Sequence, residues 1–444
     1  MLPFNYRYVI IGLFGAATVL AASLGSSHSA LSSLISKCFS NSNPTIAYLI
    51  SISGVMGELF VLFPSNWLLD KIKMRKMVTI CSGVVMVGTF LKTLVSVSVF
   101  FVILGHFMTV GVFVFYTNGS TKLSAIWFNA QERTMATSLI LGANFIGFSL
   151  GFLINAIQFN SSDDDDTSIN IELFKEKISL NFKIMFIISV VLFLLILFFF
   201  KEGPENKEDK EEEASTKLTF MESLQNLIRD PAYIKIALNF ALADTNFNLM
   251  VYLLQIILAR FGVDNTTIYL SGFVMNISCA ASFVTYGFIL TNYLTLKQGV
   301  EYGTISNVFS IAILFLLIFT KNRYFIIFGS ILYGFTYNIY CAPSAELATE
   351  QTFPGPEEQA VGVLMFSSIV LGIVFSFIIE QIIEAGFKDI YIVGLIIGIY
   401  VMAYLAIKSA DTKLKRSLFF GNIKVKKDED KKENEGLEMN MIDE

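Results

Sequence analysis

Apolar stretches of about twenty or more residues recur along the whole chain, separated by short polar segments. About twelve of them can cross a hydrocarbon core of roughly 30 Å as helices, at about 1.5 Å per residue. They cover approximately residues 6–35, 45–69, 77–97, 98–127, 131–157, 180–200, 232–258, 266–291, 297–320, 323–349, 357–384 and 387–409. The runs do not alternate as transmembrane β-strands do, and helices satisfy their own backbone in lipid. The pattern therefore predicts an all-α membrane protein with twelve transmembrane helices.

A hydrophilic segment divides these predicted helices into six and six. It begins with KEGPENKEDKEEEASTK, which is typical of a solvated linker, and continues with apolar residues at helical spacing over 220–228, which predict an interfacial helix. The predicted organisation is a six-helix half over 1–200, a linker over 201–230, a second half over 231–410 and a disordered tail over 411–444. Two such halves around a central site are typical of transporters.

Lysine and arginine residues gather on one side of this arrangement. They occur at 71–76, in the linker and in the tail, so the positive-inside rule places both termini in the cytoplasm. Glycosylation patterns that begin at Asn160 and Asn265 then fall on the outer side, which supports the same orientation. The sequence leaves open whether this is the plasma membrane or an endomembrane.

The composition excludes several other classes of protein. Hydrophobic residues make up 54% and charged residues 16%, against about a quarter charged in soluble domains. Four scattered cysteines and two histidines indicate neither a disulfide framework nor a metal site. We find no nucleophile–base set and no phosphate-binding loop, so we expect no enzyme, no cofactor and no ATP-driven pump. The expected state is a monomer in the bilayer that binds a small molecule and no nucleic acid.

A carboxylate stands near the middle of the seventh predicted span. Asp244 there costs at least about 2.5–3.5 kcal/mol on insertion scales, so such a residue normally faces a wet cavity or a partner. Asn248, Tyr252 and Gln255 follow at spacings of four, four and three, which predicts one shared helical face. The nearest basic residue, Lys235, lies nine residues earlier. We therefore favour substrate binding over a purely structural role.

Two further spans carry polar candidates. Tyr333, Tyr337 and Tyr340 recur on one face of the tenth span, where they either hold an organic cation by cation–π contacts or pack against other helices. Glu58 lies near the midplane of the second span. Two central carboxylates suit a cationic substrate or a site coupled to protons.

Three basic residues lie in outer halves of the N-terminal spans. We expect His28 and His106 to be hydrogen-bonded structural residues, with a proton relay or heme ligation as the alternatives. We expect Lys92 to extend toward the outer headgroups.

The loop after the second span carries a distinctive motif. FPSNWLLDK, over 63–71, is followed by Lys73, Arg75 and Lys76, and it resembles the charged loop of the major facilitator superfamily. The motif is especially similar to the feline leukaemia virus subgroup C receptor-related family, solute carrier family 49. Further matches are Lys92, Trp127, Phe128, Glu132, Asn144, Gly147, Gly151, Phe152, Leu153, Gly334, Phe335, Tyr340, Glu346, Ala348, Glu350, Thr352, Pro354, Gly372, Ile373 and Phe375.

This resemblance implies two six-helix halves and transport by alternating access. Family members are associated with choline and ethanolamine uptake and with heme. The resemblance also implies a polar substrate site that includes Asn144 and a conformational latch near the inner surface. The latch residues would be Asp70, Lys71, Arg75, Glu132, Glu346 and Glu350.

The chain departs from the family where the family binds choline. Gly25 and Asn248 occupy the positions of an aromatic cage, and Phe145 and Ile369 replace polar glutamines. We therefore expect a transporter of a small organic cation or amine that is choline- or ethanolamine-like, without assigning choline itself. The alternatives are a heme or porphyrin transporter and a receptor or sensor that keeps this fold without transporting.

Overall fold

The computed structural model describes residues 6–40, 44–128, 130–159, 171–203, 220–293, 295–352, 357–412 and 415. All regular elements within these ranges are helices, which confirms the predicted all-α class. The N-terminal half contains α1 (Tyr6–Phe39), α2 (Pro44–Lys71), α3 (Met74–Thr93), α4 (Val99–Gly111), α5 (Phe113–Trp127), α6 (Ala130–Gln158) and α7 (Ile171–Phe199). The C-terminal half contains α9 (Phe220–Arg229), α10 (Pro231–Tyr252), α11 (Leu254–Arg260), α12 (Asn265–Tyr293), α13 (Leu296–Phe319), α14 (Arg323–Thr352), α15 (Glu357–Glu384) and α16 (Ile390–Lys408).

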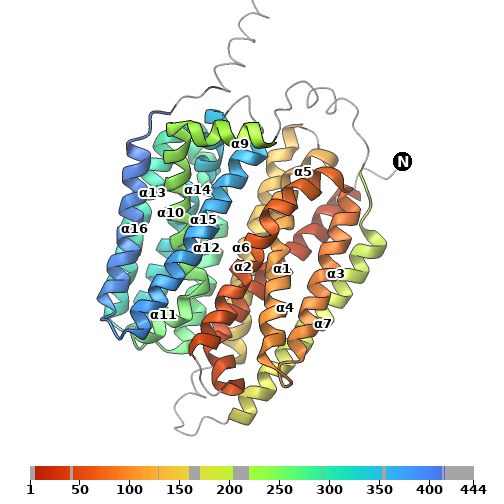
Figure 1. Ribbon diagram of the computed structural model, residues 1–444, viewed down its shortest axis with the longest axis vertical. Helices are drawn as coiled ribbons and strands as arrows, with labels where there is room; N and C mark the ends of the chain where they lie inside the picture. Colours follow the sequence, from red (N-terminus) through yellow and green to blue (C-terminus); the bar gives the residue numbers. More distant parts are fainter. Residues whose placement is uncertain are drawn as a thin grey trace, which may run out of the picture.

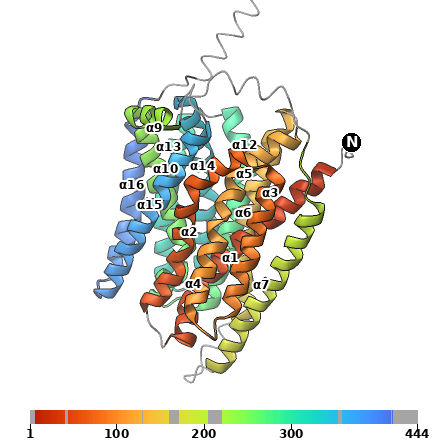
Figure 2. The same ribbon diagram turned by 45° about the vertical axis from the view of Figure 1, so that its right-hand side comes forward.

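The helices form two bundles that stand side by side, with their long axes roughly parallel (Figure 1). The start of α1, the short helix α9 and the end of α16 lie at the same end of the molecule, here called the inner end (Figures 1 and 2). Among the described residues, ten helices are long and apolar enough to cross a membrane, and the number is eleven if the bent pair α10–α11 is counted as one span. The predicted count of twelve stays a prediction.

The predicted seventh span is broken rather than continuous. The chain bends by 73° between α10 and α11, because Leu253 leaves the helical conformation with φ −108° and ψ 9°. Helix α11 then runs for only seven residues along the outer end. Residues after Leu253 therefore do not continue the helical faces of the residues before it.

The two halves contact each other along α6–α12 and α2–α15. At the outer end, Leu31 and Ile35 of α1 belong to the same buried apolar cluster as Leu254, Ile257 and Leu258 of α11. The described inner residues of the N-terminal half form a separate cluster around Phe14, Met77 and Tyr116. The outer end is therefore closed by apolar packing between the halves.

Asp230 organises the inner end of the C-terminal half. Its side chain caps α10 by accepting hydrogen bonds from the Ala232 and Tyr233 backbone N–H groups, and it also accepts from Gln351 at 2.7 Å and Lys415 at 3.1 Å. Burial acts to raise the pKa of Asp230, but these donors outweigh burial and hold its pKa below the ordinary value. The residue joins α10, the end of α14 and the segment after α16.

Small residues let several helices approach closely. A methyl group added at Gly334 of α14 would lie 1.9 Å from the Met275 carbonyl oxygen of α12, and one at Gly57 of α2 would lie 2.2 Å from the Phe107 carbonyl oxygen of α4. Without a hydrophobic driving force between helices in lipid, such close packing is a main source of helix association.

We predict that Gly334→Ala destabilises the protein by about 1–3 kcal/mol, because the added methyl overpacks the α12–α14 contact. Thermal unfolding of the purified protein in detergent measures the effect. Gly394→Ala is the matched control, since a methyl at this position on α16 meets nothing within 4 Å. Equal unfolding temperatures for the two variants would contradict this account of the contact.

Candidate functional site

Asp244 is the centre of a hydrogen-bonded network inside the C-terminal half. The side chain is buried, with 6% exposed. The Tyr337 hydroxyl of α14 donates to Oδ1, while Ser368 of α15 at 2.5 Å and Asn248 of α10 at 2.9 Å donate to Oδ2. In the part of the chain that the structure describes, no lysine or arginine forms an ion pair with Asp244. Three neutral donors from three helices therefore satisfy this carboxylate.

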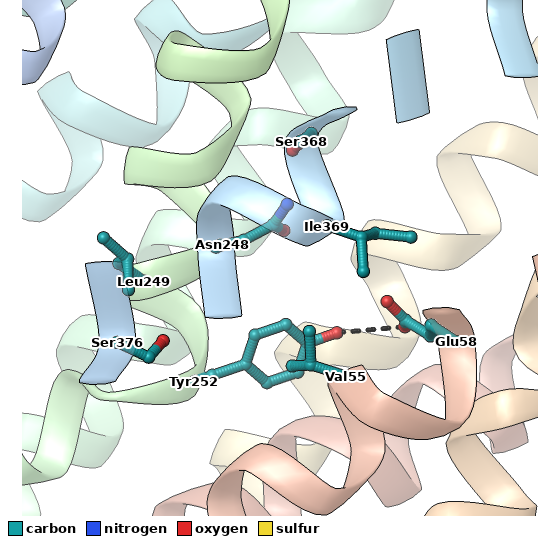
Figure 3. A pocket seen from close by; sticks show the side chains of 9 residues that line it. Val55, Glu58, Asn248, Leu249, Tyr252, Ser368, Ile369 and Ser376 are labelled. Atoms are coloured by element: carbon teal, nitrogen blue, oxygen red, sulfur yellow. Dashed lines mark hydrogen bonds between the residues drawn. The ribbon is translucent and has the colours of Figure 1, made fainter. Parts of the chain in front are cut away.

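A second buried carboxylate approaches the network from the other half. Glu58 of α2 accepts a hydrogen bond from the Tyr252 hydroxyl of α10 at 3.2 Å, and the two side chains point toward one another across a pocket (Figure 3). The pocket is lined by Val55, Glu58, Asn248, Leu249, Tyr252, Ser368, Ile369, Gly372 and Ser376. Asn248 and Ser368 therefore connect the pocket to Asp244, because they line the pocket and also donate hydrogen bonds to Asp244.

The pocket is narrow in this conformation. Its volume is about 20 Å³, close to what a single ordered water requires. Its polar groups are a carboxylate, an amide and three hydroxyls, and its apolar walls include Val55 and Ile369. This lining offers hydrogen-bond acceptors at a point where the two halves meet.

Aromatic rings near Asp244 pack against each other. Phe247 of α10 stacks on Tyr337 with ring centroids 3.8 Å apart, and Phe145 of α6 meets both rings edge-on at 6.3 Å and 5.8 Å. The Tyr337 ring is therefore occupied by protein contacts, and its hydroxyl points at Asp244. The rings fix the position of the carboxylate and do not form an open cage.

Comparison with known proteins agrees with this two-bundle arrangement. A family model for the Major Facilitator Superfamily matches residues 10–377. The chain belongs to this superfamily. Among solved structures, this facilitator is similar to a D-xylose–proton symporter with TM-score 0.73, 13% identity and coverage of 92% of this chain and 99% of that one. It is also similar to a bacterial homologue of the human lysosomal transporter Spinster, inward-facing and unoccupied, with TM-score 0.60, 13% identity and coverage of 92% and 98%.

Curated relatives confirm the narrower resemblance seen in the sequence. The facilitator is 24% identical to the choline/ethanolamine transporter flvcr2a of Danio rerio, over 86% of this chain and 81% of the relative. It is 24% identical to the human choline/ethanolamine transporter FLVCR2, over 76% and 64%. The chain is thus a multi-pass membrane transporter of a small organic solute that is similar to the FLVCR proteins. The superfamily to which it belongs is one of transporters and not of enzymes.

Five of the nine predicted substrate-site residues belong to one of these two hydrogen-bonded groups. Asp244, Asn248 and Tyr337 form one, and Glu58 and Tyr252 form the other. The predicted shared face for Gln255 is wrong, because the bend at Leu253 puts this residue on α11. Gln255 is buried there, and its Oε1 has no hydrogen-bond partner among the described residues.

Three predicted residues lie outside both the pocket lining and the Asp244 hydrogen bonds. Tyr333 exchanges a hydrogen bond of 2.7 Å with the Tyr400 hydroxyl of α16, which is a packing role. Tyr340 packs edge-on against Tyr337 at 5.4 Å, and its buried hydroxyl has no partner among the described residues. Asn144 on α6 is also buried, with no partner for its Oδ1 in the described ranges.

The predicted latch is only partly described. The side chains of Asp70 and Glu132 lie outside the described residues. Lys71 is exposed, and the Arg75 side chain donates to the Leu197 carbonyl of α7 at 3.3 Å. On α14, Glu346 is exposed and Glu350 is half-buried beside Gln351, which donates to Asp230. The latch stays a prediction.

Sequence reasoning missed several groups that build the site. Ser368, Gly372 and Ser376 recur at intervals of four on α15, and this small polar series within an apolar span was the available signal. Phe247, which stacks on Tyr337, gave no signal because phenylalanine is common throughout the spans. The expectation for Lys92 is wrong, since the side chain is 1% exposed and donates to Thr109 inside the N-terminal half.

We predict that Tyr337→Phe destabilises the protein by about 1–3 kcal/mol, because it keeps the ring stack and removes a donor from a buried carboxylate. Unfolding in detergent, followed by intrinsic fluorescence or heat, measures this loss. Tyr324→Phe, at a ring 74% exposed on the same helix, should stay within about 0.5 kcal/mol of the wild type. A Tyr337→Phe protein as stable as Tyr324→Phe would show that the hydroxyl contributes nothing.

Proposed function

We propose that this facilitator carries a small organic cation or amine by alternating access, with Glu58 and Asp244 supplying the negative charge that the solute requires. The observation that carries the proposal is a buried carboxylate from each half beside one pocket: Glu58 lines the pocket, and Asp244 accepts hydrogen bonds from the pocket residues Asn248 and Ser368. Neither carboxylate forms an ion pair with a described lysine or arginine. Intramembrane carboxylates of this kind mark substrate or ion pathways.

The two carboxylates also suggest how binding drives closure. Glu58 belongs to the N-terminal half and the Asp244 network to the C-terminal half, so ionisation of both makes the halves repel. A cation between them offsets that repulsion and favours the state in which the halves meet. Such differential binding is what shifts a transporter between conformations. The pocket between Glu58 and the C-terminal half is narrow, as contact between the halves requires.

The lining favours an ammonium group that bears N–H donors. Glu58 lines the pocket and accepts one hydrogen bond from the described residues, which leaves carboxylate lone pairs for donors of the solute. A quaternary ammonium has no N–H and is recognised chiefly by open aromatic faces. Here the ring of Tyr337 is covered by Phe247.

The curated relatives support this solute class and not the alternatives. Their names specify choline and ethanolamine, which are small organic amines or cations. The heme alternative is not favoured, since His28 and His106 lie inside the N-terminal half and do not line the pocket. We further propose that the inner end faces the cytoplasm with both termini, as the basic residues near that end indicate.

We predict that Glu58→Gln and Asp244→Asn each reduce uptake of labelled ethanolamine into proteoliposomes by at least about tenfold, because each removes a buried charge at the site. The matched control is Glu384→Gln, which neutralises an exposed carboxylate at the outer end of α15. Protein recovery and unfolding temperature show that each variant folds. Unchanged uptake in both site variants would refute the cation proposal.

We predict that ethanolamine competes more strongly than choline for the same uptake. Its ammonium donates N–H groups to the carboxylates, whereas the quaternary ammonium of choline offers only methyl groups to them. Competition curves with unlabelled ethanolamine and choline against one labelled tracer measure the order. Stronger competition by choline would contradict the proposed role of N–H donors in recognition.

A further inference from the structure

The only two histidines of the chain lie side by side next to a buried lysine. The rings of His28 on α1 and His106 on α4 have centroids 5.4 Å apart, although the residues are far apart in the sequence. Lys92 of α3 lies with its Nζ 3.5 Å from His106 Nδ1 and donates to Thr109 Oγ1 at 3.0 Å. None of the three basic residues lines the pocket at Glu58.

Close backbone packing encloses this basic cluster. A methyl at Gly105 would lie 2.4 Å from the Gly88 carbonyl oxygen and 2.9 Å from Lys92 Cγ, so α3 and α4 touch where the lysine crosses. A methyl at Gly54 of α2 would lie 3.0 Å from His106 Nε2. Packing this dense favours a ligand no larger than a proton.

The imidazoles present open positions for a proton. His28 Nδ1 lies 2.6 Å from the Leu24 carbonyl oxygen, which only accepts, so Nδ1 carries hydrogen and the neutral ring keeps a lone pair on Nε2. His28 Nε2 and His106 Nε2 are both buried without a partner among the described residues. The lone pair of His28 Nε2 is therefore available to take up a proton.

The surroundings contain little to balance a positive charge. On α7 the ring of Phe182 stacks on His28 at 5.1 Å, and cation–π contact with it stabilises a charged imidazole. The charged residues of α7 are exposed or lie at its outer end; they are Glu172, Lys175, Glu176, Lys177 and Lys183. On α2 the nearest carboxylate is Glu58, one helical turn from Gly54. Helices α3 and α4 contribute no described acidic residue.

We propose that Lys92, His106 and His28 form a proton-binding site that is separate from the carboxylate pocket and holds one exchangeable proton. Like charges this close in a low-dielectric interior oppose each other, so the three bases take up a single proton as a unit. The Lys92–His106 contact and the stacked His28 ring are the two places where that proton resides.

The position of the basic cluster implies an effect on transport, a step that rests on the proposed cationic solute. A proton held beside Gly54 puts positive charge one helical turn from Glu58. This charge weakens the binding of a cation at Glu58, and a bound cation in turn favours release of the proton. Coupling between two sites is reciprocal by linkage. The solute and the proton therefore oppose each other.

The two histidines make a direct test simple. In protein labelled with isotopic nitrogen in histidine, magnetic resonance detects only these two imidazoles. Between about pH 5 and about pH 9 we expect both to report one shared protonation step. Lys92→Met should move the midpoint of that step, while Lys183→Met, at an exposed residue next to Phe182, should leave it in place. Imidazoles that stay neutral and unchanged in the wild type across this range would overturn the proposal.

Ethanolamine uptake tests the coupling separately. The apparent affinity of the wild type should rise several-fold from about pH 6 to about pH 8, and Lys92→Met should flatten that dependence. A shared histidine step without any uptake of ethanolamine or choline would leave the proton site standing and refute the proposed function. Uptake with an identical pH profile in Lys92→Met would refute the coupling.

Discussion

The carboxylate of Asp244 sets the main constraint on the C-terminal half. A charge inside a membrane-spanning bundle must be met by donors, and here Tyr337, Ser368 and Asn248 bring α14, α15 and α10 together to supply them. The aromatic stack of Phe247 on Tyr337 holds one of these donors in place. Asn248 and Ser368 also line the pocket. A shift of either side chain in the pocket therefore alters the hydrogen bonds of Asp244 and the contacts among the three helices.

The N-terminal half buries basic groups, whereas the C-terminal half buries a carboxylate. It buries Lys92 and both histidines behind closely packed glycine contacts, and it sends Glu58 toward the partner half. The molecule thus places the acidic group on α2 and the basic groups on α1, α3 and α4 of the same half. Such a separation of charge in a low-dielectric interior lets one occupied site influence the other over a short distance.

Much of this arrangement follows from the sequence, and particular residues show where prediction stops. Asp244, Asn248, Glu58 and Tyr337 are identifiable because polar groups in apolar spans must find partners, and the structure bonds Asn248 and Tyr337 to Asp244 and Glu58 to Tyr252. Gln255 was misplaced because helical spacing assumes a straight helix, and nothing in the sequence around Leu253 announces a bend. Lys92 was misplaced because snorkelling was assumed from its position near a helix end, whereas Gly105 leaves room for it inside.

The break at Leu253 also bears on how the outer end opens. The residues that plug this end, Leu254, Ile257 and Leu258, belong to a helix of only seven residues attached through a non-helical joint. A hinge next to so short a plug allows access from outside to be controlled by a local swing, without displacement of a whole half. Opening of the outer end then need not follow from a single rigid rocking motion of one half against the other.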